Sequence, residues 1–339
     1  MCPSTKYRGK YPLNYFNENL HITYDFVYPE KSISAMCKFI SMYISILLFR
    51  KKDSILVIQK VCTNRIYANA LKLIIKLNPS KSLYDIDDAE YIRYPKATMD
   101  YFIKNCEHVS VGSTELYEYA TRLNERVFIQ TSPIVKHYSY KKNRNSILNI
   151  GWVGDLGNGN KASESFSHKT SMFKLFFPEL LKIIIPIRLI LIGVKNKSDI
   201  PEIIDYFKSS SNIEIEIPTD LYWENDSWVY EMITRFDIGV SPMVDHLFNR
   251  SKSAFKAKQY LSCGIPTIAC DVGDNKLFVK HGHNGYIIDS HLSYSQAINK
   301  IAEMGDFEYS HLSENALLSK TNYSMKNYCQ NILQHFIEY

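Results

Sequence analysis

The stretch "NRSKSAFKAKQYLSCGIPTIACDVG", residues 249–273, decides the fold class. It joins a helical pattern opened by serines, a "CGIP" stop and the fully apolar strand pattern "TIAC". This succession is typical of parallel sheets covered by helices on both faces. Lys252, Lys256 and Gln259 are spaced i, i+4 and i+7, which predicts that they project from one side of the helix. Two cations and an amide on one side either solvate the helix or hold an anion, and the stretch alone leaves both interpretations open.

The same succession of strand-like and helical patterns recurs along the whole chain. Apolar runs of strand length alternate with amphipathic helical segments, which predicts an α/β protein with parallel sheets. The predicted strands are 21–28, 54–61, 82–87, 108–112, 126–130, 147–154, 187–194, 212–218, 236–242, 267–272 and 285–289.

The chain length and the polar, aperiodic segment 137–146 predict two domains. A chain of 339 residues exceeds the size of one ordinary core. We therefore expect two doubly wound domains in tandem, over residues 1–140 and 147–325, with residues 326–339 as a C-terminal helix that packs back on the first domain.

The cysteines and the N-terminus predict a cytoplasmic protein. The seven cysteines are scattered, odd in number and without a Cys-x-x-Cys pair, which indicates free thiols in a reducing compartment. The first 16 residues carry charge and no apolar core of a signal peptide. The most apolar window, 32–49, contains Lys38 and several hydroxyl groups, so it predicts a partly buried helix rather than a membrane crossing.

The positive charge is concentrated in the first half of the chain. Residues 1–140 hold 19 Lys and Arg against 13 Asp and Glu, although the whole chain has a net charge of only +5. This distribution predicts an anionic partner for the first half. The basic residues are dispersed and accompany no nucleic-acid-binding motif, so nucleic acid is not expected. The cluster "FRKK", 49–52, follows the apolar helix and indicates either a peripheral membrane contact or a solvated helix end.

The loop that leads into the opening helix is the strongest candidate for anion binding. It follows the predicted strand 236–242, and Ser251 or Ser253 is placed to cap the helix. The first N–H groups of such a helix attract anions, and a diphosphate accepts from several donors at once. Gln259, further along the helix, would reach a ribose hydroxyl. A solvated helix face remains the alternative.

The order of these motifs resembles the donor-binding signature of the retaining glycosyltransferases of the GT-B fold, the large family 4 and its relatives. The segments "FDIGVSPM", "FKAKQYLSCGIPTIACDVG" and "HGHNGYII" carry the resemblance, between Phe236 and Ile288. The matching positions are Lys256, Tyr260, Gly264, Pro266, Gly273, Asn284 and Gly285. The resemblance implies two Rossmann-like domains that face each other across a cleft, a nucleotide-sugar donor, and no cofactor or metal.

The chain departs from the family pattern at two places. The family's two glutamates, eight positions apart, correspond to Ser251 and Gln259. Gln259 still forms hydrogen bonds but does not accept from two hydroxyls as a carboxylate would. The chain also begins with "CPSTKYRGKYPL", which resembles the loop after the family's first strand, so that strand is apparently missing.

Two further donor contacts are expected near the start of the second domain. Gly154 ends a predicted strand, where a small residue lets the backbone approach a phosphate or a sugar; an ordinary turn is the alternative. Lys169 follows Ser167 or Ser165, either of which would cap a helix. A cation at a helix N-terminus is unfavourable unless an anion compensates it, so Lys169 is the third diphosphate candidate.

The first half offers candidates for acceptor binding. Asp85, Asp87 and Asp88 follow a strand, where Asp85 would serve as a base or positioner for an acceptor hydroxyl. Capping of a helix is the favoured alternative for Asp87 and Asp88. Lys6 and Arg8 are candidate contacts to an anionic acceptor such as the diphosphate of a lipid carrier.

Together these features predict a glycosyltransferase that moves a sugar from a nucleotide diphosphate donor to a glycan or lipid-linked acceptor. By resemblance it is retaining and metal-independent, and it acts in capsule, lipopolysaccharide or exopolysaccharide synthesis at the inner face of the plasma membrane. The alternatives are a nucleotide-sugar epimerase of the same fold and a non-catalytic nucleotide-sugar-binding protein.

Overall fold

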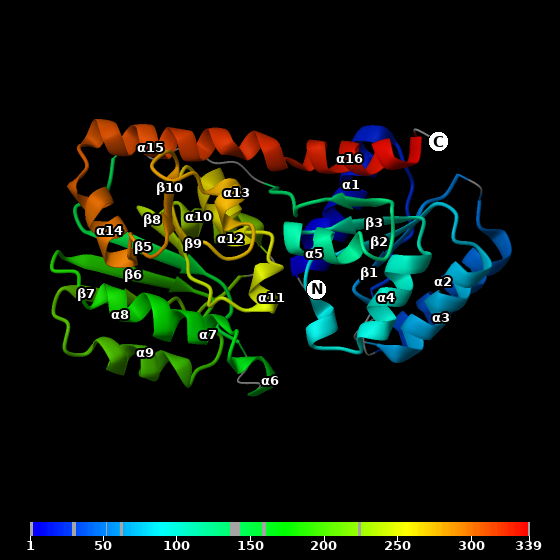
Figure 1. Ribbon diagram of the computed structural model, residues 1–339, viewed down its shortest axis with the longest axis horizontal. Coiled ribbons are helices and arrows are strands. Elements are labelled where there is room, and N and C mark those ends of the chain that lie inside the picture. Colours follow the sequence, from blue (N-terminus) through cyan, green and yellow to red (C-terminus); the bar gives the residue numbers. More distant parts are fainter. Residues whose placement is uncertain are drawn as a thin grey trace. The chain divides into compact units, whose positions relative to one another are not determined.

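The structure is a computed structural model that describes residues 3–28, 32–51, 53–61, 64–135, 143–157, 161–222 and 225–337 (Figure 1). Its chain forms two compact units. The first comprises Met1–Val135, Ser251–Ser253 and Tyr323–Tyr339, and the second comprises Lys136–Arg250 and Ala254–Asn322. Most of the predicted linker, 137–146, lies outside the described residues.

The first unit is built on a sheet of four parallel strands in the order β1-β2-β3-β4. Its elements are η1 (Thr5–Lys10), α1 (Tyr11–Leu20), α2 (Ile33–Phe49), β1 (Leu56–Gln59), α3 (Arg65–Leu77), β2 (Ser82–Ile86), η3 (Glu90–Ile92), α4 (Lys96–Asn105), β3 (His108–Val111), α5 (Thr114–Ala120), β4 (Val127–Ile129) and α16 (Met325–Ile337).

Alternation along β2 shows how helices cover both faces of this sheet. Leu83 packs with Phe16 of α1 and Ile332 of α16 in one apolar cluster. Tyr84 points to the opposite face, where its ring lies 5.3 Å from that of Phe102 in α4. Asp85 follows at the next position and therefore shares the face of Leu83.

Two expectations for the N-terminal region are wrong. Residues 21–28 are not a strand. They alternate in sequence, but their side chains stay exposed or half-buried, so no apolar face drives pairing with the sheet. The segment "TKYRGK" forms the helical turn η1 rather than a loop.

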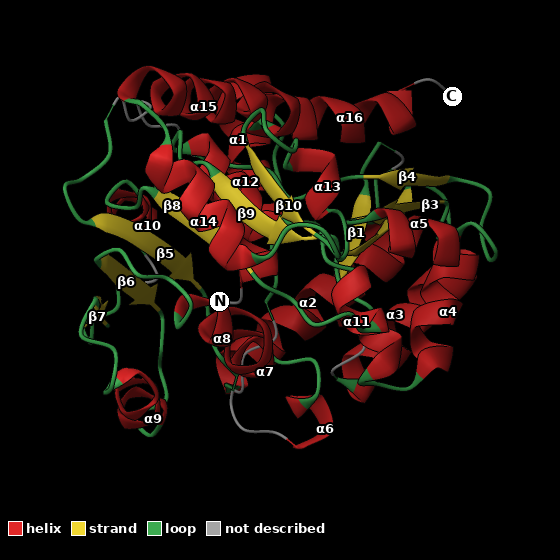
Figure 2. Ribbon diagram, turned by 60° about the vertical axis from the view of Figure 1, so that its left-hand side comes forward, coloured by secondary structure: helices red, strands yellow, loops and turns green. Residues whose placement is uncertain are grey.

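The second unit is a six-stranded parallel sheet in the order β10-β9-β8-β5-β6-β7 (Figure 2). Its strands are β5 (Leu148–Val153), β6 (Ile187–Ile192), β7 (Ile213–Glu216), β8 (Ile238–Ser241), β9 (Thr267–Cys270) and β10 (Gly285–Ile288). Read from β7 to β10, with β5 counted as strand 1, the order is 3-2-1-4-5-6. This is the strand order of a dinucleotide-binding doubly wound sheet. Its switch point lies between β5 and β8, at whose carboxyl ends such folds bind ligands.

Helices cover both faces of this sheet as well. They are α6 (Lys161–Glu164), α7 (His168–Ser171), η4 (Met172–Phe176), α8 (Phe177–Leu180), α9 (Asp199–Phe207), α10 (Asp226–Ile233), α11 (Leu247–Arg250), α12 (Phe255–Ser262), α13 (Asn275–Phe278), α14 (Tyr294–Glu303), α15 (Asp306–Leu318) and η5 (Ser319–Tyr323). One large cluster joins β5, β6 and β8 to η4, α8, α9 and α14. A smaller, alanine-rich cluster joins α12 and α15 to β9.

The buried Tyr260 fixes α12 to the sheet. Its hydroxyl accepts a hydrogen bond from the backbone N–H of Val153 at 2.9 Å. Its ring occupies the space above Gly239 of β8, where an added Cβ would lie 2.4 Å from the ring. The aromatic ring and the absent side chain are therefore complementary, and any larger residue at position 239 displaces α12.

Among the described residues, no helix is both long enough and apolar enough to cross a membrane.

We expect Gly239→Ala to lower the free energy of unfolding by about 1–3 kcal/mol, because the added methyl group overpacks the core against Tyr260. Urea denaturation followed by circular dichroism measures the change. Gly9→Ala is the matched control, since a Cβ there meets no atom closer than 3.4 Å. Equal stability of the two variants would show that α12 is not held by this contact.

Candidate functional site

The carboxyl end of β5 is the place where the predicted donor residues are best assembled. Lys256 of α12 places its ammonium nitrogen 2.8 Å from Nε2 of His168, the first residue of α7. The same nitrogen lies 5.7 Å from the centre of the Trp152 ring, at the end of β5. Two helix beginnings and one strand end thus meet around one cation, all within the second unit.

Gly154 makes this arrangement possible. A Cβ at this position would lie 2.8 Å from Cε of Lys256 and 2.9 Å from Cζ2 of Trp152. The lysine therefore reaches the imidazole only because residue 154 has no side chain. The indole N–H of Trp152 is buried and has no hydrogen-bond partner among the described residues, so the group also contains an unused donor.

The beginning of α12 differs from the expectation. Ala254 adopts a left-handed conformation with φ 54°, and the helix begins at Phe255 without a side-chain cap. The predicted continuous helix with Lys252, Lys256 and Gln259 on one face is therefore wrong, because Lys252 precedes the break. Neither Ser251 nor Ser253 caps α12. Lys256 and Gln259 remain on the same helix, three residues apart.

Lys252 belongs to the first unit, where its ammonium group forms an ion pair with Asp88. Asp88 also accepts from Lys60, whose ammonium nitrogen lies 3.0 Å from Oδ2. Burial raises the pKa of Asp88, but Lys252 and Lys60 lower it by more, and the result is a pKa below the ordinary value. Lys252 is therefore neutralised by a carboxylate and is not part of the group around Lys256.

Lys169 is also held by carboxylates. Its ammonium nitrogen lies 2.5 Å from Glu202 and 2.9 Å from Asp199, both in α9. The hydrogen bond that Lys169 donates to Glu202 raises the pKa of Lys169; burial opposes this effect and Asp199 supports it. Ser167 caps α7, as one of the two predicted alternatives stated. The anion that compensates this cation is therefore supplied by the protein itself.

The two positions that correspond to the family's glutamates are both buried. Ser251 is fully buried, and its hydroxyl accepts from the backbone N–H of Ala89 at 3.0 Å within the first unit. Gln259 is 5% exposed in the middle of α12. Neutral side chains at both positions avoid the cost of burying a carboxylate.

Asp85 is buried and fully engaged in a hydrogen-bond network of the first unit. It is 2% exposed and accepts from Nε of Arg8 at 3.0 Å, from Nε2 of Gln59 at 2.8 Å and from the hydroxyl of Ser110. A second guanidinium nitrogen of Arg8 closes a bidentate ion pair with it. An acceptor hydroxyl would have to displace one of these donors to reach the carboxylate.

Arg8 has no exposed surface left for an acceptor. Its side chain is fully buried, and it also donates to the backbone oxygen of Gln130. Burial lowers the pKa of Arg8, but the carboxylate of Asp85 outweighs this effect and raises it above the ordinary value. Lys6, two residues earlier, is half-buried and lies 5.9 and 5.5 Å from the ring centres of Tyr7 and Tyr11.

The carboxylates after β2 gather around Lys60. Its ammonium nitrogen lies 2.8 Å from Asp87 and 3.8 Å from Glu90. Burial lowers the pKa of Lys60, but the carboxylates raise it by more. Within the described part of the chain, no group of three or more His, Cys, Asp or Glu side chains has the arrangement of a metal site.

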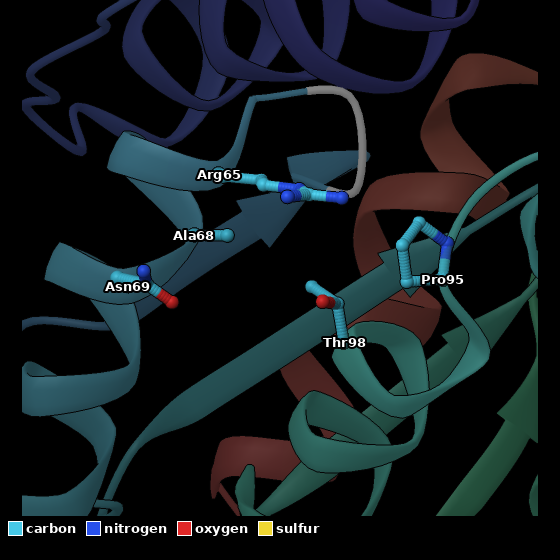
Figure 3. Close-up of a pocket in the computed structure, with 5 residues that line it drawn as sticks. All are labelled: Arg65, Ala68, Asn69, Pro95 and Thr98. Atoms are coloured by element: carbon cyan, nitrogen blue, oxygen red, sulfur yellow. The ribbon is translucent and has the colours of Figure 1, made fainter.

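A shallow pocket lies between α3 and the start of α4 (Figure 3). Its lining residues are Arg65, Ala68, Asn69, Pro95 and Thr98. It contains none of the residues predicted to bind donor or acceptor.

His168 and Trp152 are the two residues of the Lys256 group that the sequence did not single out as ligand contacts. His168 follows the capping serine in the sequence, and Trp152 belongs to the apolar strand pattern 147–154. The available signal was positional, since both lie where a strand ends or a helix begins in a parallel sheet.

The comparisons with known proteins agree with this fold. Residues 149–304 match the family model described as "Glycosyl transferases group 1". No curated protein sequence matches the chain.

Solved structures match most of the chain. The protein HepE of Anabaena in complex with UDP aligns with a TM-score of 0.61 at 11% identity, over 90% of this chain and 82% of that one. The same protein with UDP-glucose gives 0.57 at 10% identity, over 84% and 79%. Sucrose-phosphate synthase from Thermosynechococcus elongatus gives 0.65 at 12% identity, over 92% and 80%.

The fold is thus GT-B, the fold of the solved glycosyltransferase structures that the chain matches. Within this fold, residues 149–304 of the second unit are similar to the group 1 glycosyltransferases.

We expect Arg8→Ala to destabilise the protein by about 3–5 kcal/mol, because it leaves the Asp85 carboxylate buried without its cation. Thermal and urea unfolding measure the loss. Lys6→Ala is the matched control from the same helical turn and should cost less than about 1 kcal/mol. The double variant Arg8→Met/Asp85→Leu should recover much of the lost stability. If Arg8→Ala is as stable as Lys6→Ala, the pair does not hold the N-terminal segment in place.

Proposed function

We propose that the protein transfers a sugar from a nucleoside diphosphate donor to a glycan or lipid-linked acceptor, with the donor diphosphate bound by the Lys256 group. One observation carries the proposal. The Lys256 ammonium, 2.8 Å from His168, lies at the carboxyl end of β5, beside the switch point of the sheet. Lys256 brings a cation there from the first turn of α12, and Gly154, which has no side chain, leaves room beside it.

The chemistry follows from where charge develops. Cleavage of the sugar–phosphate bond leaves an additional negative charge on the departing diphosphate. A cation and helix N–H groups that are already in position stabilise this charge without reorganisation. The chain needs no metal for this step in our proposal, and the sugar is transferred with retention of its configuration.

The other cations have different tasks in this proposal. Lys169 is a secondary contact that reaches the diphosphate only by exchanging its ion pairs with Asp199 and Glu202. Lys252 remains a donor candidate only if its ion pair with Asp88 opens. Gln259 lies one turn after Lys256 and is proposed to contact the donor ribose.

The relatives suggest a first donor to test. HepE of Anabaena is described in complexes with UDP and with UDP-glucose. We therefore propose a uridine diphosphate sugar as the donor class.

In the first unit we assign Arg8 and Asp85 a structural task, since each is buried in contacts with the other. Lys6 remains our candidate for an anionic acceptor. The setting we propose is the inner face of the plasma membrane, with a peripheral membrane contact, in the synthesis of a capsule, lipopolysaccharide or exopolysaccharide.

The decisive experiment separates transfer from its alternatives. The purified protein is screened by thermal shift against nucleotide sugars, because a bound donor raises the apparent stability. Release of nucleoside diphosphate is then measured with and without glycan or lipid-linked acceptors. Acceptor-dependent release supports a transferase, and conversion of the sugar without acceptor indicates an epimerase. Binding without any turnover, across all acceptors, indicates a non-catalytic binding protein.

We expect Lys256→Ala to weaken UDP binding by roughly 10- to 150-fold, which corresponds to the loss of one charge-assisted hydrogen bond of about 1.5–3 kcal/mol. Isothermal titration measures the affinity. Lys208→Ala is the matched control, because Lys208 is an exposed lysine paired with Asp205 in α9. This variant should bind UDP as the unaltered protein does. Equal affinity of the two variants would remove Lys256 from the donor site.

A further inference from the structure

The helix α2 exposes a continuous apolar ridge. Among its side chains the structure buries only Phe39. The exposed residues recur at intervals of three and four, which places them on one side of the helix. They are Ile33, Met36, Ile40, Ile44 and Leu48, with exposed fractions of 78, 51, 48, 48 and 67%. A ridge of this length on a water-exposed helix is unfavourable unless something covers it.

The neighbouring helix α3 has a second ridge of the same kind. Ile66, Leu73 and Leu77 are 78, 45 and 66% exposed and lie seven and four residues apart on one side. The opposite side of α3 is buried in the first unit through Leu71, Ile74 and Ile75. The helix therefore already has its core contact, and the exposed ridge is additional to it.

The two ridges lie on the same side of the helix pair, which we call the α2–α3 face. Helices α2 and α3 lie side by side (Figure 1). The rings of Phe39 and Tyr67, 4.1 Å apart, mark their mutual contact. Arg50, after the end of α2, donates to the backbone oxygens of Asn78 and Lys81, after the end of α3, at 3.3 and 2.9 Å. The helices therefore run in the same direction. Successive residues of an α-helix are rotated by about 100° around its axis. Counted from the mutual contact, both ridges are therefore rotated toward the same side of the helix pair.

This region also carries the excess positive charge of the first half. Residues 32–81 contain nine Lys and Arg and a single acidic residue, Asp53. The rest of the first 140 residues contains ten Lys and Arg and twelve Asp and Glu. Lys51 follows the C-terminal end of α2, near Leu48 of its ridge, and Lys76 borders the ridge of α3; both lysines are exposed. The apolar ridges match the acyl-chain region of an anionic bilayer, and the neighbouring cations match its headgroups.

We propose that the α2–α3 face docks the protein on the surface of an anionic lipid bilayer. The apolar ridges enter the boundary between headgroups and acyl chains, and the bordering lysines contact anionic headgroups. A helix of 17 residues lies in the plane of the interface rather than across it. A second copy of the chain would bring like charges together, so lipid is the better partner. This inference specifies the membrane contact that is part of the proposed function. It rests on the proposed function only for the reason why the protein would bind a membrane.

The test is co-sedimentation of the full chain with vesicles. It compares phosphatidylcholine alone with a mixture containing about a third phosphatidylglycerol, at low and high salt. We expect binding to the anionic vesicles, weakened by salt, and little binding to phosphatidylcholine. Ile40→Asp/Ile44→Asp should bind at least about tenfold more weakly, because it places charge in the apolar layer. Lys51→Glu/Lys76→Glu should also lose about tenfold or more.

Ile204→Asp is the matched control. Ile204 is a helical isoleucine of similar exposure, 53%, but it lies in α9 beside Glu202 and Asp205. This variant should bind vesicles as the unaltered protein does. Circular dichroism and UDP titration on each sample show that the variants are folded, and UDP binding also tests the proposed function independently of lipid.

Two results would overturn the proposal. One is vesicle binding that is absent in the unaltered protein or unchanged in both double variants. The other is a concentration-dependent dimer that Ile40→Asp/Ile44→Asp abolishes while no vesicle binding occurs, which would show that a second copy covers the face.

Discussion

The contact between Tyr260 and Gly239 is the constraint on which the second unit of the molecule depends. It presses α12 against β8, and the Tyr260 hydroxyl ties the same helix to Val153 at the end of β5. Lys256 lies one turn earlier on α12, so these two attachments direct its side chain over Trp152 and Gly154. Several residues of the recognised motif thus act by packing, and their effect is to place one cation at the carboxyl edge of the sheet.

The three lysines predicted to bind a diphosphate differ in what already neutralises them. Lys169 and Lys252 are paired with carboxylates, which reduce their attraction for an incoming anion. Lys256 lies beside an imidazole and an aromatic face. The three lysines are equivalent in the sequence pattern but lie in different surroundings in the folded chain.

The sequence predicted the strands of both sheets well because each is a short apolar run bounded by polar turns. The prediction failed at residues 21–28, where the same alternation has no apolar surface to pair with. It failed again at Ala254, which adopts the left-handed conformation. Alanine has no preference for this conformation, so a sequence pattern does not predict it. The pairing of Arg8 with Asp85 spans 77 residues of sequence. Such a contact depends on how the chain folds in space, so charge and order along the sequence could only suggest that both residues contact a ligand.

The replacement of the family's two glutamates has a physical consequence for the donor site. Gln259 is buried three residues after Lys256 on the same helix. A glutamate there would lower the positive potential that Lys256 presents, and its burial would need a compensating cation. A neutral amide removes both effects but accepts fewer hydrogen bonds from ribose hydroxyls. In the donor site that we propose, this exchange therefore weakens contact with the ribose and makes contact of Lys256 with the diphosphate relatively more important.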